Sequence, residues 1–254
     1  MAIALNTLRE SVRDRVFYNL VLFVLLLIVA SVIVGEIAVG QEAKIVVDFG
    51  LSSMMIFGVL IAVFIGVSLV SRDIERRAIY AALSKPIHRS TFILGKYLGY
   101  CLTLLVNTAI MAMAMTMALF YLKSGLDRVQ LNIWSAVYLI YGELAVIAAV
   151  ALFFSCFSSP MLSALLTLLV FLIGRWSPDL RLIAETSSSR VISGLSHALY
   201  LFLPNLANFN YINETAHGEV IPLKMIVAST IYALGYIVVA LTLAIFIFNR
   251  RDFK

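Results

Sequence analysis

Apolar runs of membrane length follow one another along this chain, separated mostly by short polar segments. A helix rises about 1.5 Å per residue, so a run of about 20 residues crosses a hydrocarbon layer of about 30 Å. Charged residues make up only 13% of the 254 residues, against about 25% in soluble domains. We therefore expect an all-α integral membrane protein, because a helix satisfies its own backbone hydrogen bonds inside lipid.

The runs predict about six membrane helices within a single membrane domain, 1–254. The first segment, 1–15, has Leu5, Leu8 and Val12 at helical spacing and predicts a helix lying in the membrane interface. Because the first run follows this mixed-charge segment, we expect no cleavable signal peptide. The parts are 1–15 (interfacial helix), 16–70 (spans 1 and 2), 71–90 (polar segment), 91–174 (spans 3 to 5), 175–222 (long outer loop) and 223–254 (span 6 and tail).

The basic residues predict which side of the membrane each segment faces. With both termini in the cytoplasm, the inner segments hold twelve Lys and Arg residues and the outer segments hold seven, Arg175 among them. This bias is the one that cytoplasmic loops show. The net charge of +5 is therefore interpreted as a topology signal and not as a nucleic-acid surface.

The segment 71–90 concentrates more charge than any other between two apolar runs. Ile74, Ala78 and Ala81 share one helical face, and Pro86 ends the helix, so the segment predicts a short amphipathic helix and a turn. It is either a docking device or a solvated loop that only sets orientation. The residues expected to contact a partner are Arg72, Glu75, Arg76, Arg77, Pro86 and Arg89.

These residues resemble the permease subunits of ABC-2 type ATP-driven exporters. Such subunits show an acidic residue, a short helix, Leu-Ser-x-Pro-x-x-Arg and a Gly-Lys pair at the head of the third span. The matching residues are Glu75, Leu83-Ser84-Lys85-Pro86, Arg89 and Gly95-Lys96, and the departure is Arg77-Ala78, where many relatives have Gly-Thr. The six-span layout is also similar, including that of the subgroup that serves maturation of nitrous oxide reductase.

The resemblance implies that 71–90 is a coupling helix docking on a separate cytoplasmic ATPase. Gly95-Lys96 is followed by Tyr97 and has no upstream glycine, so it is not a phosphate-binding loop. ATP and Mg²⁺ are therefore expected in the partner, and this chain is expected to be a permease subunit and not an enzyme. Two permease copies and two ATPase copies in a cell (inner) membrane are implied, with an extracytoplasmic accessory protein left open.

Glu143 is the costliest residue for a membrane helix, because a carboxylate at mid-depth costs at least about 2.5 kcal/mol. It either lines the translocation path or is a structural residue that is protonated or hydrogen-bonded. Asn107, Thr103 and Thr108 are candidate partners, and Tyr138 offers a nearby hydroxyl.

Small residues four apart predict close helix packing on two spans. Four methionines at alternate positions, Met111 to Met117, split between two helix faces and favour packing over a copper ladder. The three histidines lie on separate segments, so no metal site is expected. The predicted packing residues are Gly58, Ala62, Gly66, Gly95 and Gly99.

The loop 175–222 is too apolar for a free loop, since Val191, Ile192, Leu195 and Leu199 follow helical spacing. We expect one or two helices at the outer interface, before the last span, either capping an exit or simply packing there. Two rival functions stay open: a scaffold that passes ATPase motion to an outer partner, and an ATP-independent carrier.

Overall fold

The computed structural model describes residues 42–75, 89–123, 128–187 and 189–250, with single positions at 21, 22, 25, 28, 29 and 33. These parts are helical and contain no strand, which confirms the all-α class. The predicted interfacial helix, most of the first span, Arg76, Arg77, Pro86 and the tail 251–254 lie outside the described residues. The elements are α3 (Glu42–Glu75), α5 (Arg89–Lys123), α6 (Arg128–Ser155), α7 (Pro160–Arg175), α8 (Ser177–Thr186), α9 (Arg190–Phe202), the 3-10 helix η1 (Leu206–Phe209), α10 (Ile212–Ala216) and α11 (Leu223–Arg250).

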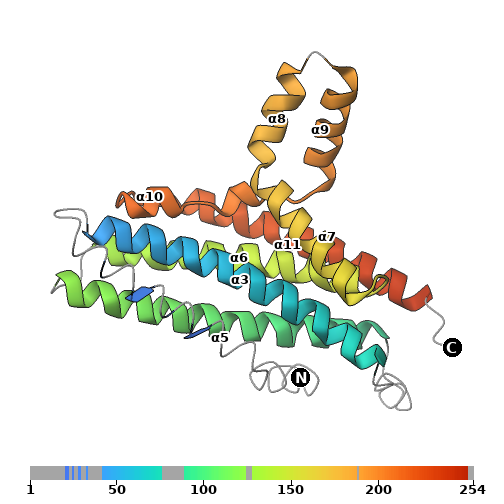
Figure 1. Cartoon of the computed structure of the whole chain (residues 1–254), viewed down its shortest axis with the longest axis horizontal. Helices are drawn as coiled ribbons and strands as arrows, with labels where there is room; N and C mark the ends of the chain where they lie inside the picture. The colour runs from blue at the N-terminus through green and yellow to red at the C-terminus, as the bar shows by residue number, and fades with distance from the viewer. Residues whose placement is uncertain are drawn as a thin grey trace.

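Four helices of the described part, α3, α5, α6 and α11, are long and apolar enough to cross a membrane. They run alongside one another in Figure 1 and correspond to the predicted second, third, fourth and sixth spans. α3 begins at Glu42, so the helix already includes the polar residues Lys44 and Asp48 that were expected in a loop. Lys44 and Asp48 lie in the first turns of the apolar stretch Lys44–Val67, near one end of the span.

The predicted fifth span is broken. α7 has 16 residues and rises about 24 Å, which is short of the roughly 30 Å of a hydrocarbon layer. Trp176 leaves the helical conformation, Pro178 stands in the first turn of α8, and the chain bends by 65° between the two helices. A proline restricts the residue before it and cannot donate to the preceding turn, so the helix ends here. The described residues thus contain four spans, or five if α7 and α8 count as one.

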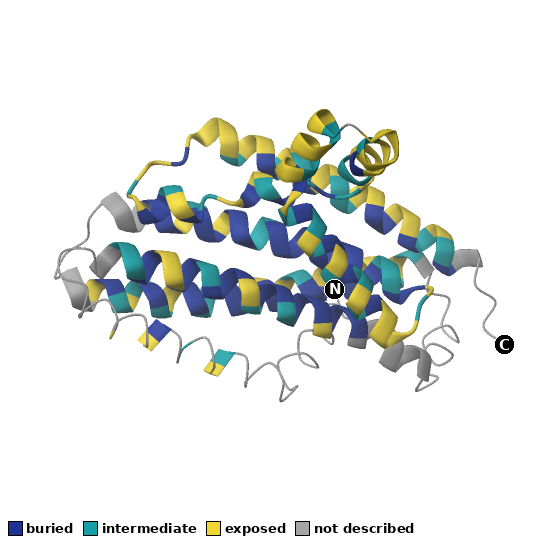
Figure 2. Cartoon of the chain, turned by 45° about the horizontal axis from the view of Figure 1, so that its top comes forward, coloured by how far each residue is buried: buried dark blue, intermediate teal, exposed yellow. Residues whose placement is uncertain are grey.

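The predicted outer loop, 175–222, contains α9 where the spacing of 191–199 predicted a helix, and it also contains α8, η1 and α10. α8 and α9 form a hairpin that projects away from the long helices (Figure 1), and Ser193 Oγ closes it by donating to the Ala184 carbonyl oxygen at 2.7 Å. Most of the hairpin is exposed in Figure 2. Its exposed residues include the apolar Leu182, Val191 and Leu195. Its location at the outer interface stays a prediction.

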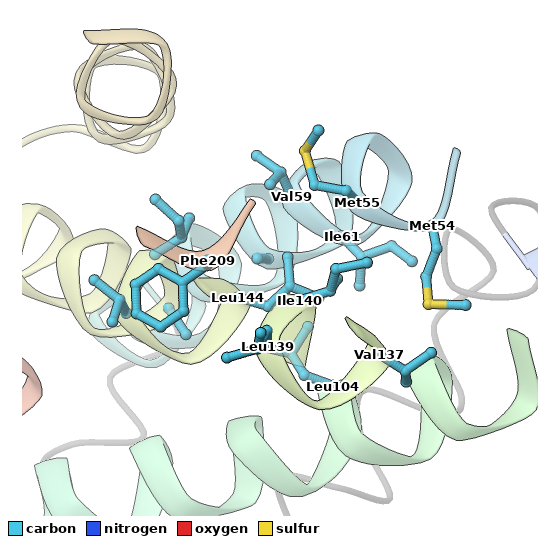
Figure 3. Close-up of a cluster of buried hydrophobic side chains, with 14 of the residues drawn as sticks. Met54, Met55, Val59, Ile61, Leu104, Val137, Leu139, Ile140, Leu144 and Phe209 are labelled. Carbon is cyan, nitrogen blue, oxygen red and sulfur yellow. The ribbon is translucent and has the colours of Figure 1, made fainter. Parts of the chain in front are cut away.

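α6 is the centre of the bundle. It contacts α3, α5, α7 and α11, and its residues Leu139, Ile140 and Leu144 are almost fully buried (Figure 3). Lipid is as apolar as leucine, so burial alone does not hold such helices together; close packing and interhelical hydrogen bonds do.

Glycines of α3 set how closely α3 and α6 approach. A Cβ atom on Gly58 would lie 2.6 Å from Leu144 Cδ1, and one on Gly66 would lie 2.9 Å from Ala151 Cβ. Ala62, between them, is fully buried. These residues face α6 along one side of α3, where a larger side chain would push the helices apart.

Two tyrosine hydroxyls of α5 form hydrogen bonds to α3 and α6 close to these small residues. Tyr100 of α5 donates to the carbonyl oxygen of Ala62 in α3, and Tyr97 donates to that of Ala145 in α6 at 3.1 Å. Both side chains are buried, so these hydrogen bonds satisfy groups that lipid cannot.

The methionines of α5 divide as the spacing predicted. Met111 and Met115 are fully buried, whereas Met113 and Met117 are exposed. Met115 packs against α3, with its Sδ 2.9 Å from the position of a Cβ on Gly50. The buried pair fills the interface between α3 and α5.

Replacing Gly66 by valine tests the packing of α3 on α6. The Ala151 Cβ cannot move without its backbone, so we expect Gly66→Val to lower the free energy of unfolding by about 1–3 kcal/mol. Gly194→Val is the matched control, because a Cβ there meets nothing within 4 Å. Thermal unfolding in detergent, followed by circular dichroism, measures both; equal midpoints for the two variants would contradict the packing role.

Candidate functional site

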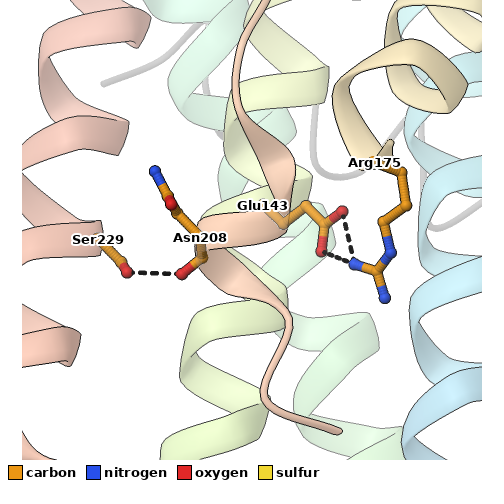
Figure 4. Close-up of polar contacts among 4 residues, drawn as sticks. All are labelled: Glu143, Arg175, Asn208 and Ser229. Atoms are coloured by element: carbon orange, nitrogen blue, oxygen red, sulfur yellow. Dashed lines mark hydrogen bonds and ion pairs between the residues drawn. The ribbon is translucent and has the colours of Figure 1, made fainter. Parts of the chain in front are cut away.

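Glu143 forms an ion pair with Arg175 inside the bundle (Figure 4). Arg175 Nη1 donates to Oε1 at 3.3 Å and to Oε2 at 3.2 Å. The Glu143 side chain is 1% exposed and that of Arg175 is 17% exposed. Glu143 is the twelfth of the 24 residues in the apolar stretch Asn132–Ser155 of α6, so the pair lies near mid-depth.

The break after α7 explains why Arg175 reaches this depth. The sequence count placed Arg175 among the outer basic residues and did not predict that its side chain meets a carboxylate halfway along α6. A helix of 16 residues that starts near the end of α6 rises about 24 Å, so its last residue is still beside the middle of its neighbour. Each charge thereby has a partner, which offsets part of the cost of holding it there.

The polar residues of α5 are not the partners of Glu143, contrary to the expectation. Thr103 and Thr108 donate their hydroxyls to the carbonyl oxygens of Gly99 and Leu104, one turn back in their own helix. Asn107 is fully buried, and both polar atoms of its amide lack a hydrogen-bond partner among the described residues. A buried amide without a partner is costly, and a bound water would satisfy it.

The segment 202–209 lies beside Glu143, since a Cβ atom on the neighbouring Gly142 would be 3.3 Å from the Phe209 ring, and the segment is held by α11. Ser229 Oγ donates to the Asn208 carbonyl oxygen at 2.7 Å (Figure 4), and Tyr236 Oη donates to the Phe202 carbonyl oxygen at 3.2 Å. Tyr232 Oη accepts from the Asn205 N–H at 2.7 Å. Three hydroxyls on one face of α11 therefore bond the backbone of this segment.

Gly174, beside Arg175, lets the end of α7 approach the same segment. A Cβ there would lie 2.5 Å from the carbonyl oxygen of Pro204, a backbone atom that cannot swing aside. Leu206 and Phe209 of η1 are buried beneath it. The ion pair, the end of α7 and the segment 202–209 thus form one packed unit.

The remaining predicted residues lie elsewhere in the fold. Tyr138 is 47% exposed and its hydroxyl meets Thr230 Oγ1 of α11 at 3.1 Å, so it does not join Glu143. In α5, Gly99 is buried and Gly95 half-buried. The coupling residues are described only at their backbones and only in part: Arg72 and Glu75 end α3, and Arg89 begins α5.

The described residues contain no group of three or more His, Cys, Asp and Glu side chains placed to hold a metal ion. The polar centre is instead an ion pair between Arg175 of α7 and Glu143 of α6, packed beside the segment 202–209. Such a pair has two states, joined and separated, and so it can register a movement of α7 relative to α6.

The fold and the site define a polytopic helical membrane protein in which a broken span places the positive charge of Arg175 beside the middle of α6. The sequence matches the family described as ABC-2 family transporter protein over residues 1–253, and the chain belongs to that family. No individual curated protein matches it. The chain is therefore the membrane domain of an ABC-type transporter, and membrane components of this family generally pair with a cytoplasmic ABC ATPase. The narrower resemblance to nitrous-oxide-reductase maturation permeases stays a prediction.

A double-mutant cycle tests whether the pair holds α7 to α6. Arg175→Gln leaves the buried carboxylate of Glu143 without its cation, so we expect a loss of about 3–5 kcal/mol in the free energy of unfolding. Glu143→Gln combined with Arg175→Gln replaces both charges by amides and is expected to recover most of that loss. Unfolding in detergent measures all variants; a double variant as unstable as the sum of the two single changes would show that the residues do not interact.

Proposed function

We propose that this chain is the permease subunit of an ATP-driven exporter, coupled through residues 71–90 to a separate cytoplasmic ATPase. One observation supports the coupling most directly. α3 continues as a helix to Glu75 although its apolar stretch ends at Val67. The eight further residues extend it by about 12 Å, as a rigid arm leading into the charged segment.

The packing of α3 offers a route from that arm to the ion pair. Gly58 lies against Leu144, the neighbour of Glu143 in α6, and α3 also contacts α7 directly. A tilt of α3 would therefore act on both helices that carry the pair. Because packed interfaces switch between discrete arrangements, this movement would be all-or-none.

In this proposal two copies of the chain meet two ATPase subunits in the cell membrane, with both termini on the cytoplasmic side. ATP and Mg²⁺ are bound by the ATPase, and this chain is no enzyme. Closure of the ATPase pair tilts α3 and α5 and converts an inward-facing arrangement to an outward-facing one. The segment 202–209 and the α8–α9 hairpin are placed to close the outer side of the path.

Two observations favour rival functions. The broken pair α7–α8 is a feature of ion-driven carriers, whose substrate sites lie at interrupted helices. The exposed α8–α9 hairpin would also suit a scaffold that moves an outer partner without moving cargo. Dependence of transport on ATP separates the first rival from our proposal, and transport itself separates the second.

Charge reversal in the coupling segment tests the docking. We expect Glu75→Lys or Arg89→Glu to abolish co-purification with the ATPase, or to leave ATP hydrolysis running without transport, because a like charge would face the partner's groove. Arg181→Glu is the control, since this exposed residue pairs with Glu185 within α8, away from the coupling segment. Normal binding and coupled transport in both segment variants would rule out docking at these residues.

Neutralising Glu143 tests the role of the pair in transport. Glu143→Gln retains the size of the side chain and a weaker hydrogen bond to Arg175, so we expect normal expression and assembly with reduced transport. Vesicle transport, normalised to the amount of inserted protein, measures the effect. Full transport in this variant would remove Glu143 from the mechanism.

A further inference from the structure

An apolar pocket of about 740 Å³ lies between α6, α7, α9 and α11, apart from the ion pair. Its volume falls in the range of about 300–1,000 Å³ that is usual for small-molecule sites. We propose that this pocket binds the hydrocarbon chain of a membrane lipid. The proposal concerns binding and does not rest on the exporter function.

The walls of the pocket match a hydrocarbon chain and little else. None of the fourteen lining residues is charged, and Phe153, Phe154, Phe202 and Leu243 are among its large apolar side chains. A sugar, a peptide or an anion would lose its hydrogen bonds to water there without replacement. A hydrocarbon chain has none to lose.

The two polar side chains of the wall are engaged with the protein itself. Tyr232 accepts from the Asn205 N–H, and Tyr236 donates to the Phe202 carbonyl oxygen. Ligand sites for polar molecules carry a few polar groups aimed at the ligand. Here the hydroxyls instead hold the backbone that shapes one side of the pocket.

The pocket opens sideways, toward the surroundings of the bundle. Leu201, Ile231 and Val239 line it and are exposed, and the last two lie within the membrane stretch Leu223–Phe248 of α11. A lipid chain can enter from the hydrocarbon layer without crossing water. A helix of a second copy, about 10 Å wide, would fill the volume within about two turns, so it does not suit the pocket as well as a slender chain.

Gly235 makes the room. It lines the pocket in the middle of α11, and a Cβ atom there would meet nothing within 4 Å. Glycine is unfavourable inside a helix compared with alanine, and in this place its missing side chain leaves space for an occupant. A side chain at 235 would start with a Cβ atom in open space and would extend into the pocket.

A photo-crosslinking lipid tests the proposal. The purified chain is placed in lipid nanodiscs that contain a phosphatidylcholine with a diazirine in its acyl chain, irradiated, digested and mapped by mass spectrometry. We expect label in the pocket residues of α11 and at 201–203, above the level on the exposed side of α7 at Met161 and Leu165. Gly235→Phe should reduce the pocket label by about tenfold, the effect of losing about two buried methylene groups.

Gly194→Phe is the matched control, because Gly194 is exposed on α9, has the same open space and does not line the pocket. It should leave the pocket label unchanged, and thermal unfolding of both variants shows whether each still folds. Pocket label equal to that of the α7 surface, or unaffected by Gly235→Phe, would overturn the proposal. The proposal would also be overturned if the pocket residues carried no lipid label and were instead crosslinked to a second copy of the chain.

Discussion

A carboxylate in the middle of a membrane helix needs a partner, and in this protein the partner determines the course of the chain. Glu143 stands halfway along α6, the helix around which the bundle packs, and Arg175 meets it from the end of α7. For that to happen α7 has to stop at this depth. The break at Trp176 and Pro178 provides the stop, and the chain then turns out of the bundle into the α8–α9 hairpin.

The elements that follow are arranged around this stop. The segment 202–209 returns across the end of α7, where Gly174 leaves room for the Pro204 carbonyl. Hydroxyls of Ser229, Tyr232 and Tyr236 then fasten the returning backbone to α11. Backbone that is not helical is tolerated at membrane depth only when protein satisfies its polar groups. These three side chains satisfy three of them, the carbonyl oxygens of Phe202 and Asn208 and the N–H of Asn205.

Hydropathy alone was enough to predict the long helices α3, α5, α6 and α11, because the run of apolar residues needed to cross a bilayer decides them. Glu143 was also recognised, since a lone carboxylate in an apolar run is conspicuous. Its partner was not, because a basic residue at the end of a run has the appearance of a topology signal. The short length of 160–174 was the available clue, since about 22 Å of helix does not carry Arg175 across the layer. The hydroxyl contacts of α11 and the pocket around Gly235 arise from tertiary packing, and no local sequence pattern predicts them.

Helix α3 links the fold to the proposed function, because it extends beyond its apolar stretch at one end and packs against α6 at the level of Glu143. The central proposal is that nucleotide bound to a separate ATPase moves this helix. The direct test is a pulsed electron–electron resonance distance between spin labels at the exposed positions Phe64 of α3 and Val238 of α11, in the reconstituted complex with its ATPase. We predict a distance distribution that shifts when ATP is added to a hydrolysis-deficient ATPase and does not shift when ATP is added to the chain alone. The same distribution with and without ATP, in a complex whose unmodified ATPase supports transport, would contradict the account.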